Sequence, residues 1–343
     1  MEPIPSRTCF KEIELVKPFE CIACSGKLSN RIVTAEKMFG LNDSFVYDCC
    51  TTCGTLRIVD PPTDLSRYYP SHYYSFNQPC KNEFSARSNI RKWLFEARIS
   101  AKLWRKPRWA KLLSLLRPVS IYGDLKYLHS VEGISLHSQV LDVGCGNGYL
   151  IREMFEAGFR NLRGVDPFNQ GEIRIGNSVL ITPTTTELLP NASFDLVMLH
   201  HVLEHFADPA IALQEVLRLL ADKGTCIVRI PLADSDPFHE YRENWGEFDA
   251  PRHFTLFSRS GFESLCKRIG LKCIREEFDG TAVAYWLSEM YRRGICFVDP
   301  KTNRFRTPES TFTTLELKTY SDRAAAMNKS GKSGRGVFYL TAE

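Results

Sequence analysis

The chain lacks long hydrophobic runs and any large excess of one charge. No stretch of 18 consecutive apolar residues occurs among its 343 residues, so we expect no transmembrane segment. The first twenty residues contain prolines and mixed charge, without the basic and apolar regions of a secretory signal peptide. The net charge of +4 is too small by itself to indicate nucleic-acid binding. We therefore expect a cytoplasmic protein.

The composition is that of a folded protein with a sizeable core. Hydrophobic residues make up 43% of the chain and charged residues 24%, which excludes a composition typical of disorder. A length of 343 residues is enough for two or three compact units. Twelve cysteines at scattered spacings fit reduced thiols with one metal site better than a disulfide framework.

Two CxxC pairs stand near the N-terminus. Cys21 and Cys24 form the first pair, Cys50 and Cys53 the second, with 25 residues between them. Four thiolates in two such pairs suit a tetrahedral zinc ion, although a rubredoxin-like iron site and four reduced core cysteines are alternatives. Cys49 competes with Cys50, but only Cys50 has the CxxC spacing. The pattern predicts a zinc-ribbon-like domain over residues 1–64.

An aromatic and basic segment follows over residues 65–135. The stretch LSRYYPSHYYSF at 65–76 contains tyrosines that either stack on a sugar or base or pack as a linker. Residues 80–117 contain eleven lysines and arginines against two glutamates, and apolar residues recur there at helical spacing. We predict one helix that ends before Pro107 and a second over 109–116. The alternatives for their charge are a solvated face, an RNA-binding surface or a membrane-binding surface.

Strands and helices alternate from residue 138 onward. This alternation predicts a mostly parallel α/β sheet covered on both faces, within a domain over 136–343. An insertion at about 281–335 should contain one aromatic helix followed by polar loops, and VFYLTA should form the last strand. The other predicted strands are 139–143, 161–166, 178–181, 194–200, 224–230 and 271–277, and the predicted helices are 148–157, 207–220 and 258–269.

The first of these strands ends in a glycine turn. VLDVGCGNGYL at 140–150 has glycines in a G-x-G-x-G pattern, and ligands of such sheets bind at the carboxyl ends of strands. The dinucleotide fingerprint G-x-G-x-x-G is absent because position 149 is Tyr149, and no Gly-Lys-Ser/Thr follows for a phosphate loop. Asp166 ends the next strand, 24 residues after Asp142, where a carboxylate can accept both hydroxyls of a ribose. The alternative for Asp166 is a turn or helix-cap residue.

Four segments in this order resemble class I S-adenosylmethionine-dependent methyltransferases. They are VLDVGCGNGYL, GVDPF, FDLVMLHHVLEHFADP and LLADKGTCIVRIP, and the resemblance covers about 138–277 with a last strand at 336–341. It implies a Rossmann-like, seven-stranded sheet and S-adenosylmethionine as cofactor. The implied cofactor-binding residues are Asp142, Gly144, Cys145 and Gly146 at the methionine end, Asp166 at the ribose, Pro167, Phe168 and Thr186 or Glu187 at the adenine, and His200 closing the pocket. Many relatives carry an aspartate at about Thr185, which this chain lacks.

A narrower resemblance concerns the acceptor. The cysteine pairs, the tyrosine stretch and WGEFDAPRHFTLFSRSGFESLCKRIG at 245–270 resemble bacterial methyltransferases of sugar and polysaccharide pathways. This resemblance implies a small-molecule acceptor, such as a nucleotide-linked or lipid-linked sugar. Some sugar C-methyltransferases carry a catalytic histidine where His253 stands here, but this chain lacks their fuller His-Glu-His signature.

Three places in the sequence offer a base for the acceptor. They are His253 after the fifth strand, His239 with Glu240 in DPFHEY, and His201 beside His200 at the end of the fourth strand. A histidine with an ordinary pKa near 6.5 suits proton removal at neutral pH, although packing is the alternative role for each. We expect His205 to brace the helix that starts near Asp208.

Two other functions compete with a small-molecule methyltransferase. Some ribosomal-RNA methyltransferases also join a cysteine zinc site to this fold, and the basic segment would suit RNA. A non-catalytic cofactor-binding module is the second alternative, and the intact glycine turn with Asp166 argues against lost cofactor binding. The sequence after the fourth strand reads LHHVLEH, without the Asp/Asn-Pro-Pro-aromatic turn of many amide and exocyclic-nitrogen methyltransferases.

Overall fold

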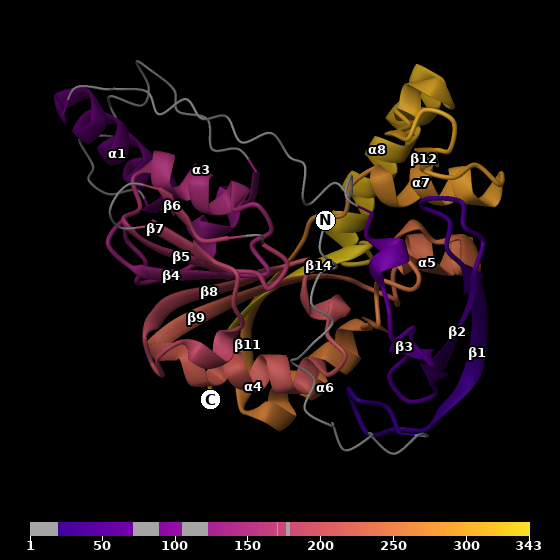
Figure 1. Cartoon of the computed structure of the whole chain (residues 1–343), viewed down its shortest axis with the longest axis horizontal. Helices are drawn as coiled ribbons and strands as arrows, with labels where there is room; N and C mark the ends of the chain where they lie inside the picture. The colour runs from indigo at the N-terminus through magenta and orange to yellow at the C-terminus, as the bar shows by residue number, and fades with distance from the viewer. Residues whose placement is uncertain (1–19, 71–88, 105–122, 170, 176–178) are drawn as a thin grey trace.

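The computed structural model describes residues 20–70, 89–104, 123–169, 171–175 and 179–343. Its centre is an eight-stranded sheet in the order β11-β14-β9-β8-β4-β5-β7-β6 (Figure 1). Strands β7, β5, β4, β8 and β9 are parallel, while β14 runs antiparallel to both β9 and β11. The strands are β4 (Gln139–Val143), β5 (Asn161–Val165), β6 (Ile173–Ile175), β7 (Val179–Thr182), β8 (Phe194–His200), β9 (Leu220–Pro231), β11 (Leu271–Phe278) and β14 (Arg335–Ala342).

The predicted fold class is therefore confirmed, with one strand more than the seven expected. The additional strand, β6, has three residues and pairs antiparallel with β7 at the sheet edge. Strand β9 begins at Leu220, where we predicted the helix 207–220 to continue up to a turn at Lys223 and Gly224.

Helices cover both faces of the sheet. In Figure 1, α1 and α3 lie on one side of the sheet, and α4 and α6 lie on the other. Each face has its own apolar core, one built with Ile151 and Met154 of α3, the other with Leu213 of α4 and Leu265 of α6. The helices are α1 (Asn89–Trp104), α3 (Tyr149–Ala157), α4 (Pro209–Leu219), α5 (Asp236–Tyr241), α6 (Arg259–Ile269), α7 (Val283–Arg292) and α8 (Thr314–Ser330).

Local capping explains why the helix limits follow the sequence pattern. The Asp208 side chain accepts hydrogen bonds from the first backbone amides of α4, and Ser258 does the same for α6. Gly158 and Gly270 end α3 and α6 in the left-handed conformation. The predicted helix of the basic segment is α1, whereas the second predicted helix at 109–116 lies outside the described residues.

The N-terminal cysteine-rich region forms a second, antiparallel sheet. It contains β1 (Leu28–Ala35), β2 (Ser44–Cys50) and β3 (Leu56–Val59), and its fourth strand is β10 (Thr255–Leu256). Strand β10 comes from the region that we assigned to the methyltransferase domain. Main-chain hydrogen bonds therefore join residues 20–59 to the segment around His253.

The insertion at 281–335 is more helical than predicted. The aromatic helix is confirmed as α7, but the expected polar loops include α8, which has 17 residues. Thr313 and Glu316 form a capping box that starts α8, and Gly331 ends it. Among its residues only Ala324 is buried, so the apolar periodicity that reveals a core-facing helix is absent. A two-stranded ribbon of β12 (Val298–Asp299) and β13 (Arg304–Phe305) lies between the two helices in sequence.

Short 3-10 helices occupy several connections between these elements. They are η1 (Ser66–Tyr68), η2 (Gly123–Ser130), η3 (Thr186–Leu188), η4 (Leu203–His205), η5 (Arg242–Asn244), η6 (Gly246–Phe248) and η7 (Pro308–Ser310). Two of them carry residues with a predicted role: η3 holds Thr186, a predicted cofactor residue, and η4 holds His205, which was expected to brace the next helix. Within the described ranges, no helix has both the length and the apolar character that crossing a bilayer requires.

Candidate active site and cysteine cluster

The glycine turn lies at the carboxyl end of β4, as predicted. Gly144, Gly146 and Gly148 all have left-handed backbone conformations, with φ angles of 67°, 52° and 77°. A Cβ atom on Gly144 would lie 2.6 Å from a methyl carbon of Val202, in the loop after β8. Glycine is therefore required at position 144 both by the backbone and by close packing against that loop.

Replacing Gly144 with alanine is expected to impair cofactor binding as well as stability. The left-handed backbone alone should cost about 1–2 kcal/mol in the free energy of unfolding. Contact with Val202 should also displace the loop after β8. Gly133→Ala is a matched control, because Gly133 has a φ of 76° and a Cβ atom there would meet nothing beyond its chain neighbours within 4 Å. Thermal unfolding should show a loss of stability in both variants, larger in Gly144→Ala because of Val202, and cofactor titration should show weakened binding only in Gly144→Ala. Equal affinities would contradict this interpretation.

Asp166 joins the glycine turn to the loop after β5. One carboxylate oxygen accepts a hydrogen bond from the Gly146 amide at 2.9 Å, and the other accepts one from the Phe168 amide at 2.9 Å. The side chain is 8% exposed, and burial raises its pKa. Each carboxylate oxygen has a second acceptor position, so Asp166 can hold this turn and still bind two hydroxyls of a ligand.

The other predicted cofactor residues differ in their degree of exposure. Asp142 is 4% exposed at the end of β4, and burial raises its pKa well above the ordinary value, with Asp124 and Asp166 adding to the effect. Phe168 is exposed, and its ring stacks on that of Tyr69 at 6.5 Å between centroids. The remaining ones are Cys145 (half-buried), Pro167 (exposed), Thr186 (half-buried) and Glu187 (exposed).

His200 ends β8 beside a charged cluster. Its ring stacks on that of Tyr127 at 5.9 Å, and burial lowers its pKa to about 4. Neither ring nitrogen has a hydrogen-bond partner among the described residues. The Tyr127 hydroxyl donates to Asp279, which also pairs with Arg229 at 2.6 Å. A neutral His200 therefore lies at the carboxyl end of β8, and both its ring nitrogens lack a hydrogen-bond partner in the described part of the chain.

Glu204 forms the centre of a buried acid–base cluster just after β8. Its side chain is fully buried, and one carboxylate oxygen lies 3.3 Å from Nδ1 of His201 and 4.0 Å from Nε2 of His253. The other carboxylate oxygen has no hydrogen-bond partner within the described part of the chain. Burial raises the pKa of Glu204 to about 8, which places its titration near neutral pH.

His253 and His205 complete this cluster. The Nδ1 atom of His253 lies 2.8 Å from the carbonyl oxygen of Glu247, so Nδ1 carries the hydrogen and Nε2 remains a proton acceptor. The rings of His205 and His253 meet edge to face at 4.7 Å. Burial lowers the pKa of both histidines, that of His205 to about 3. These imidazoles are therefore neutral, and potential ligand atoms of Glu204, His205 and His253 lie within 4.8 Å of one another.

Sequence analysis located this cluster only in part. It placed His253 and His201 among the candidate bases, but it gave His205 the role of bracing α4, which Asp208 performs instead. Nδ1 of His205 instead lies 2.9 Å from the Arg252 carbonyl and 3.3 Å from the Tyr69 hydroxyl. The sequence placed Glu204 at the end of the fourth strand and Tyr69 in the aromatic stretch, but nothing in it indicated that either residue lies beside His205 and His253.

His239 does not belong to this cluster. It lies on α5 with its side chain exposed and its ring beside that of Phe238. Its neighbour Glu240 forms an ion pair with Arg323 of α8. The candidate base in DPFHEY is therefore separated from the group formed by Glu204, His205 and His253.

The four predicted cysteines come together at one end of the N-terminal sheet. Their sulfur atoms lie within 4.8 Å of one another, with 3.7 Å from Cys21 to Cys53 and 3.5 Å from Cys24 to Cys50. Tetrahedral zinc with Zn–S bonds of about 2.3 Å requires sulfur separations of about 3.8 Å, so the four thiols fit such an ion. The Cys49 sulfur contacts the carbonyl oxygen of Gly54 instead, which agrees with the CxxC spacing.

The cysteine cluster packs against the main sheet. Cys21 and Cys50 belong to the same apolar core as Phe262 of α6. Arg268, also on α6, donates to the carbonyl oxygen of Ile22 between the first two cysteines. Disorder in this cluster would therefore disturb the packing of the apolar core beneath α6.

Comparisons with known proteins agree with this architecture. A family model described as a methyltransferase domain matches residues 103–276, more than half of the chain. A tRNA U34 carboxymethyltransferase from Idiomarina loihiensis is 32% identical over 113 residues, which cover 29% of this chain and 34% of that protein. A protein of the same name from Helicobacter pylori is 29% identical over 152 residues, covering 39% of this chain and 56% of that protein. The chain thus spans between about a third and a little over half of these relatives.

Solved structures also resemble this chain, at low sequence identity. An S-adenosylmethionine-dependent methyltransferase from Archaeoglobus fulgidus is 16% identical, with a TM-score of 0.38 over 70% of this chain and 96% of that one. A cyclopropane synthase from Mycobacterium tuberculosis is 14% identical, with a TM-score of 0.40 over 62% of this chain and 80% of that one. Because the family model covers more than half of the residues, the chain belongs to the class I S-adenosylmethionine-dependent methyltransferases.

Proposed function

We propose that the protein methylates a small molecule and that His253 removes the proton from the acceptor. The observation that carries this proposal is the buried cluster of Glu204, His205 and His253. Glu204 and His205 belong to the same loop after β8 as Val202, which lies against Gly144 of the glycine turn. A base held beside Glu204, just after the neighbouring strand β8, would suit transfer to an oxygen or carbon acid.

The cofactor would occupy the turn between β4 and α3. Asp166 would accept the ribose hydroxyls, and Gly144 and Gly146 would let the methionine end approach the backbone. Asp142, whose buried carboxyl has a raised pKa, would become ionised next to a positively charged ligand. The bound cofactor supplies an electrophilic methyl group on its sulfonium. The residues of this chain therefore have only to orient both molecules and to accept a proton.

Nε2 of His253 is positioned to accept that proton. The hydrogen bond from Nδ1 to the Glu247 carbonyl fixes the tautomer, and Asp249 lies 3.9 Å from Nε2. Burial opposes ionisation of Asp249, but the Arg252 guanidinium outweighs it and lowers the pKa of this carboxyl. The ionised Asp249 would therefore stabilise the imidazolium that forms when His253 takes up the proton.

His253→Asn is expected to reduce turnover by about 10²–10⁴-fold, the range typical for loss of a general base. The asparagine amide can still donate to the Glu247 carbonyl, so the variant removes the basic Nε2 and retains the local hydrogen bond. Cofactor affinity should remain unchanged, and His239→Asn, on the exposed side of α5, is the control. Steady-state kinetics and calorimetric titration of the cofactor test this; full turnover in His253→Asn would exclude His253 as the base.

A sugar or glycan precursor is the acceptor that we propose. The resemblance of 245–270 to sugar-pathway methyltransferases supports it, and so does the depth of the cluster, because His253 is 6% exposed and Glu204 is fully buried. A small acceptor reaches such a base more easily than a folded macromolecule does. The Tyr69 ring beside Phe168 and His205 offers an aromatic surface for such a ligand.

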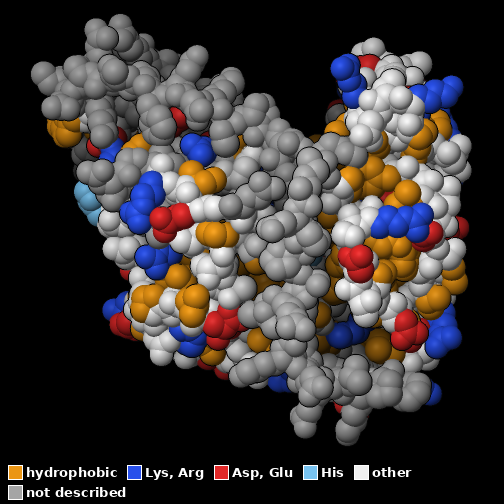
Figure 2. Space-filling model, in the orientation of Figure 1, with side chains coloured by type: hydrophobic (Ala, Val, Ile, Leu, Met, Phe, Trp, Pro, Cys, Tyr) orange, Lys and Arg blue, Asp and Glu red, His pale blue; other side chains and the backbone are white. Residues whose placement is uncertain are grey.

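RNA is the second candidate acceptor, favoured by the names of the relatives. Much of the basic region at 80–117 lies outside the described residues, so its surface provides no argument for or against RNA binding. Over the described part of the face shown in Figure 2, basic and acidic side chains are interspersed. An RNA-binding face commonly has a basic stripe instead. The sugar proposal is placed first on the resemblance of 245–270 and the depth of the cluster, and RNA remains the alternative acceptor.

Mass spectrometry of acceptors incubated with isotope-labelled cofactor separates these proposals. Label in nucleotide-linked or lipid-linked sugars would support the small-molecule proposal, and label in unmodified tRNA or ribosomal RNA would replace it. A protein without measurable affinity for S-adenosylmethionine in calorimetry would contradict the enzymatic function altogether.

We also propose that the four clustered cysteines bind a structural zinc ion, because their sulfur spacing fits it.

A further inference from the structure

We propose that the N-terminal cysteine-rich sheet is part of the active-site machinery, with Tyr47 and Glu36 as positioning residues for His253. This inference rests on the proposed role of His253 as the base. Both residues lie in the N-terminal sheet region, outside residues 103–276 that match the methyltransferase family model. The contacts of three consecutive residues, Arg252, His253 and Phe254, point to this role.

Tyr47 binds the backbone of His253 directly. Its side chain is fully buried on β2, and its hydroxyl donates a hydrogen bond of 2.7 Å to the His253 carbonyl oxygen. The ring packs edge to face on Phe248 at 5.0 Å, which limits its movement. A rigid donor thus fixes the peptide unit that carries the imidazole.

Glu36 holds the residue before His253. Its carboxylate lies 3.0 Å from the Arg252 guanidinium, and both side chains are fully buried. The amides of Phe39 and Leu41 also donate to this carboxylate at 3.1 Å, so the turn after β1 fixes its position. A buried ion pair of this kind keeps its geometry because an unpaired charge would be costly at either end.

Arg252 extends this link to the aromatic segment. It donates to the Tyr68 carbonyl oxygen at 3.1 Å and pairs with Asp249 at 2.6 Å. Tyr69, which follows Tyr68 in the chain, places its hydroxyl 3.3 Å from Nδ1 of His205. One guanidinium therefore connects the N-terminal sheet to the loops that carry both histidines of the cluster.

Phe254, the residue after His253, is bound on both sides. Its carbonyl oxygen accepts a hydrogen bond from the Ile58 amide of β3 at 2.9 Å, and its amide donates to the Glu204 carbonyl at 2.7 Å. The adjoining strand β10 then pairs with β3. The N-terminal sheet thus bonds to the residues on each side of His253 as well as to His253 itself.

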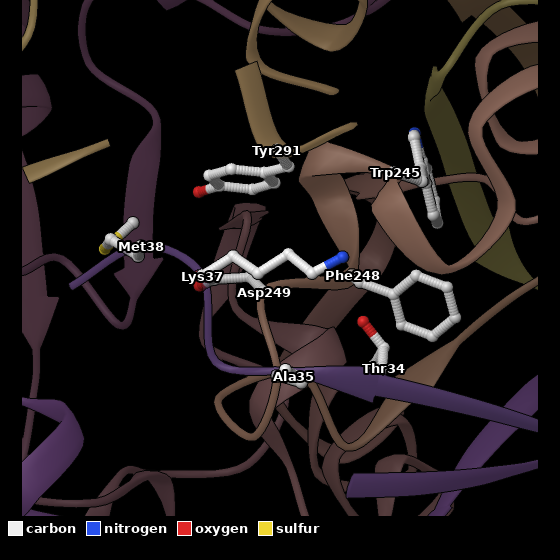
Figure 3. A pocket seen from close by; sticks show the side chains of 9 residues that line it. Thr34, Ala35, Lys37, Met38, Trp245, Phe248, Asp249 and Tyr291 are labelled. Carbon is white, nitrogen blue, oxygen red and sulfur yellow. The ribbon is translucent and has the colours of Figure 1, made fainter. Parts of the chain in front are cut away.

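The joint between this sheet and the segment before His253 is closely packed. In Figure 3, Thr34, Lys37 and Met38 surround a small cavity together with Trp245, Phe248 and Tyr291. The cavity has a volume of about 10 Å³, which is enough for about one water molecule. Lys37 crosses the joint and donates to the Glu243 carbonyl oxygen at 2.9 Å. Such packing leaves the sheet little freedom to move relative to His253.

Tyr47→Phe and Glu36→Gln test the inference, with Tyr285→Phe as a matched control. Tyr285 is also a buried tyrosine, and its hydroxyl contacts Asp236 at 3.0 Å, away from the cluster. We expect kcat to fall about tenfold in Tyr47→Phe and further in Glu36→Gln, with cofactor affinity unchanged. The control should lose comparable thermal stability without a change in kcat. The nitrogen-15 NMR shifts of the His253 imidazole should change in Tyr47→Phe and remain constant in Tyr285→Phe.

The outcomes separate this inference from the function on which it rests. If His253→Asn abolishes turnover while Tyr47→Phe behaves like Tyr285→Phe in kcat and NMR, the positioning role is overturned and the base assignment stands. If His253→Asn retains full turnover, His253 is not the base, and the positioning role of Tyr47 and Glu36 is overturned with it. Should Glu36→Gln not fold, the milder Tyr47→Phe decides the question, since it removes a single hydroxyl.

Discussion

Asp166→Ala is expected to weaken binding of S-adenosylmethionine by at least about a hundredfold. A carboxylate that accepts two ribose hydroxyls makes two hydrogen bonds to a charged group, each contributing about 1.5–3 kcal/mol. A loss of about 1.4 kcal/mol corresponds to a tenfold change in affinity. The alanine also removes the acceptor of the Gly146 and Phe168 amides, so the glycine turn loses its tie to the next loop. Isothermal titration calorimetry gives the dissociation constant.

Asp166→Asn separates the two roles of this side chain. The amide oxygen can still accept one backbone hydrogen bond, while the amide nitrogen can no longer accept a hydroxyl. We therefore expect an affinity between those of the original protein and Asp166→Ala, with a smaller loss of thermal stability than in the alanine variant. Unchanged affinity in a folded Asp166→Ala protein would remove Asp166 from the cofactor site.

The regular elements of the main sheet were predictable because their signals are local. The strand at 194–200 has the limits expected from its apolar run, and the helix after it starts at the cap supplied by Asp208. Where local signals were weak, the prediction was wrong. Helix α8 exposes most of its surface and has no apolar stripe, so its residues were expected to form loops.

The acid–base cluster was only partly predictable because it depends on contacts between distant segments. Spacing along β8 places His201 and Glu204 at one strand end, since consecutive residues there remain close in space. Nothing in the local pattern shows that His253, 49 residues after Glu204, returns to the same place. That contact results from hydrogen bonds between the Phe254 backbone and both Glu204 and Ile58. The exposure of His239 likewise depends on how α5 packs, which its short sequence does not reveal.

Cys50→Ser is expected to release the metal and lower the melting temperature by about 10 °C or more. Structural zinc in small cysteine sites contributes about 10–16 kcal/mol of apparent binding free energy at neutral pH, comparable to the whole stability of a domain. A serine hydroxyl is a poor substitute for a thiolate ligand. Cys50 also belongs to the core beneath α6, so the loss should spread into the main sheet. Differential scanning calorimetry and elemental analysis of the purified protein measure both effects.

Cys49→Ser is the matched control, because it replaces the sulfur of the neighbouring cysteine by oxygen, as Cys50→Ser does at position 50. The Cys49 sulfur contacts the carbonyl oxygens of Cys50 and Gly54 and is not among the four clustered sulfur atoms. We therefore expect Cys49→Ser to retain one zinc ion per chain and nearly the original melting temperature. Equal metal loss in the two variants would contradict the ligand set, and iron in the unmodified protein would replace zinc in this proposal. If the N-terminal sheet positions His253, Cys50→Ser should also reduce kcat more than it weakens cofactor binding.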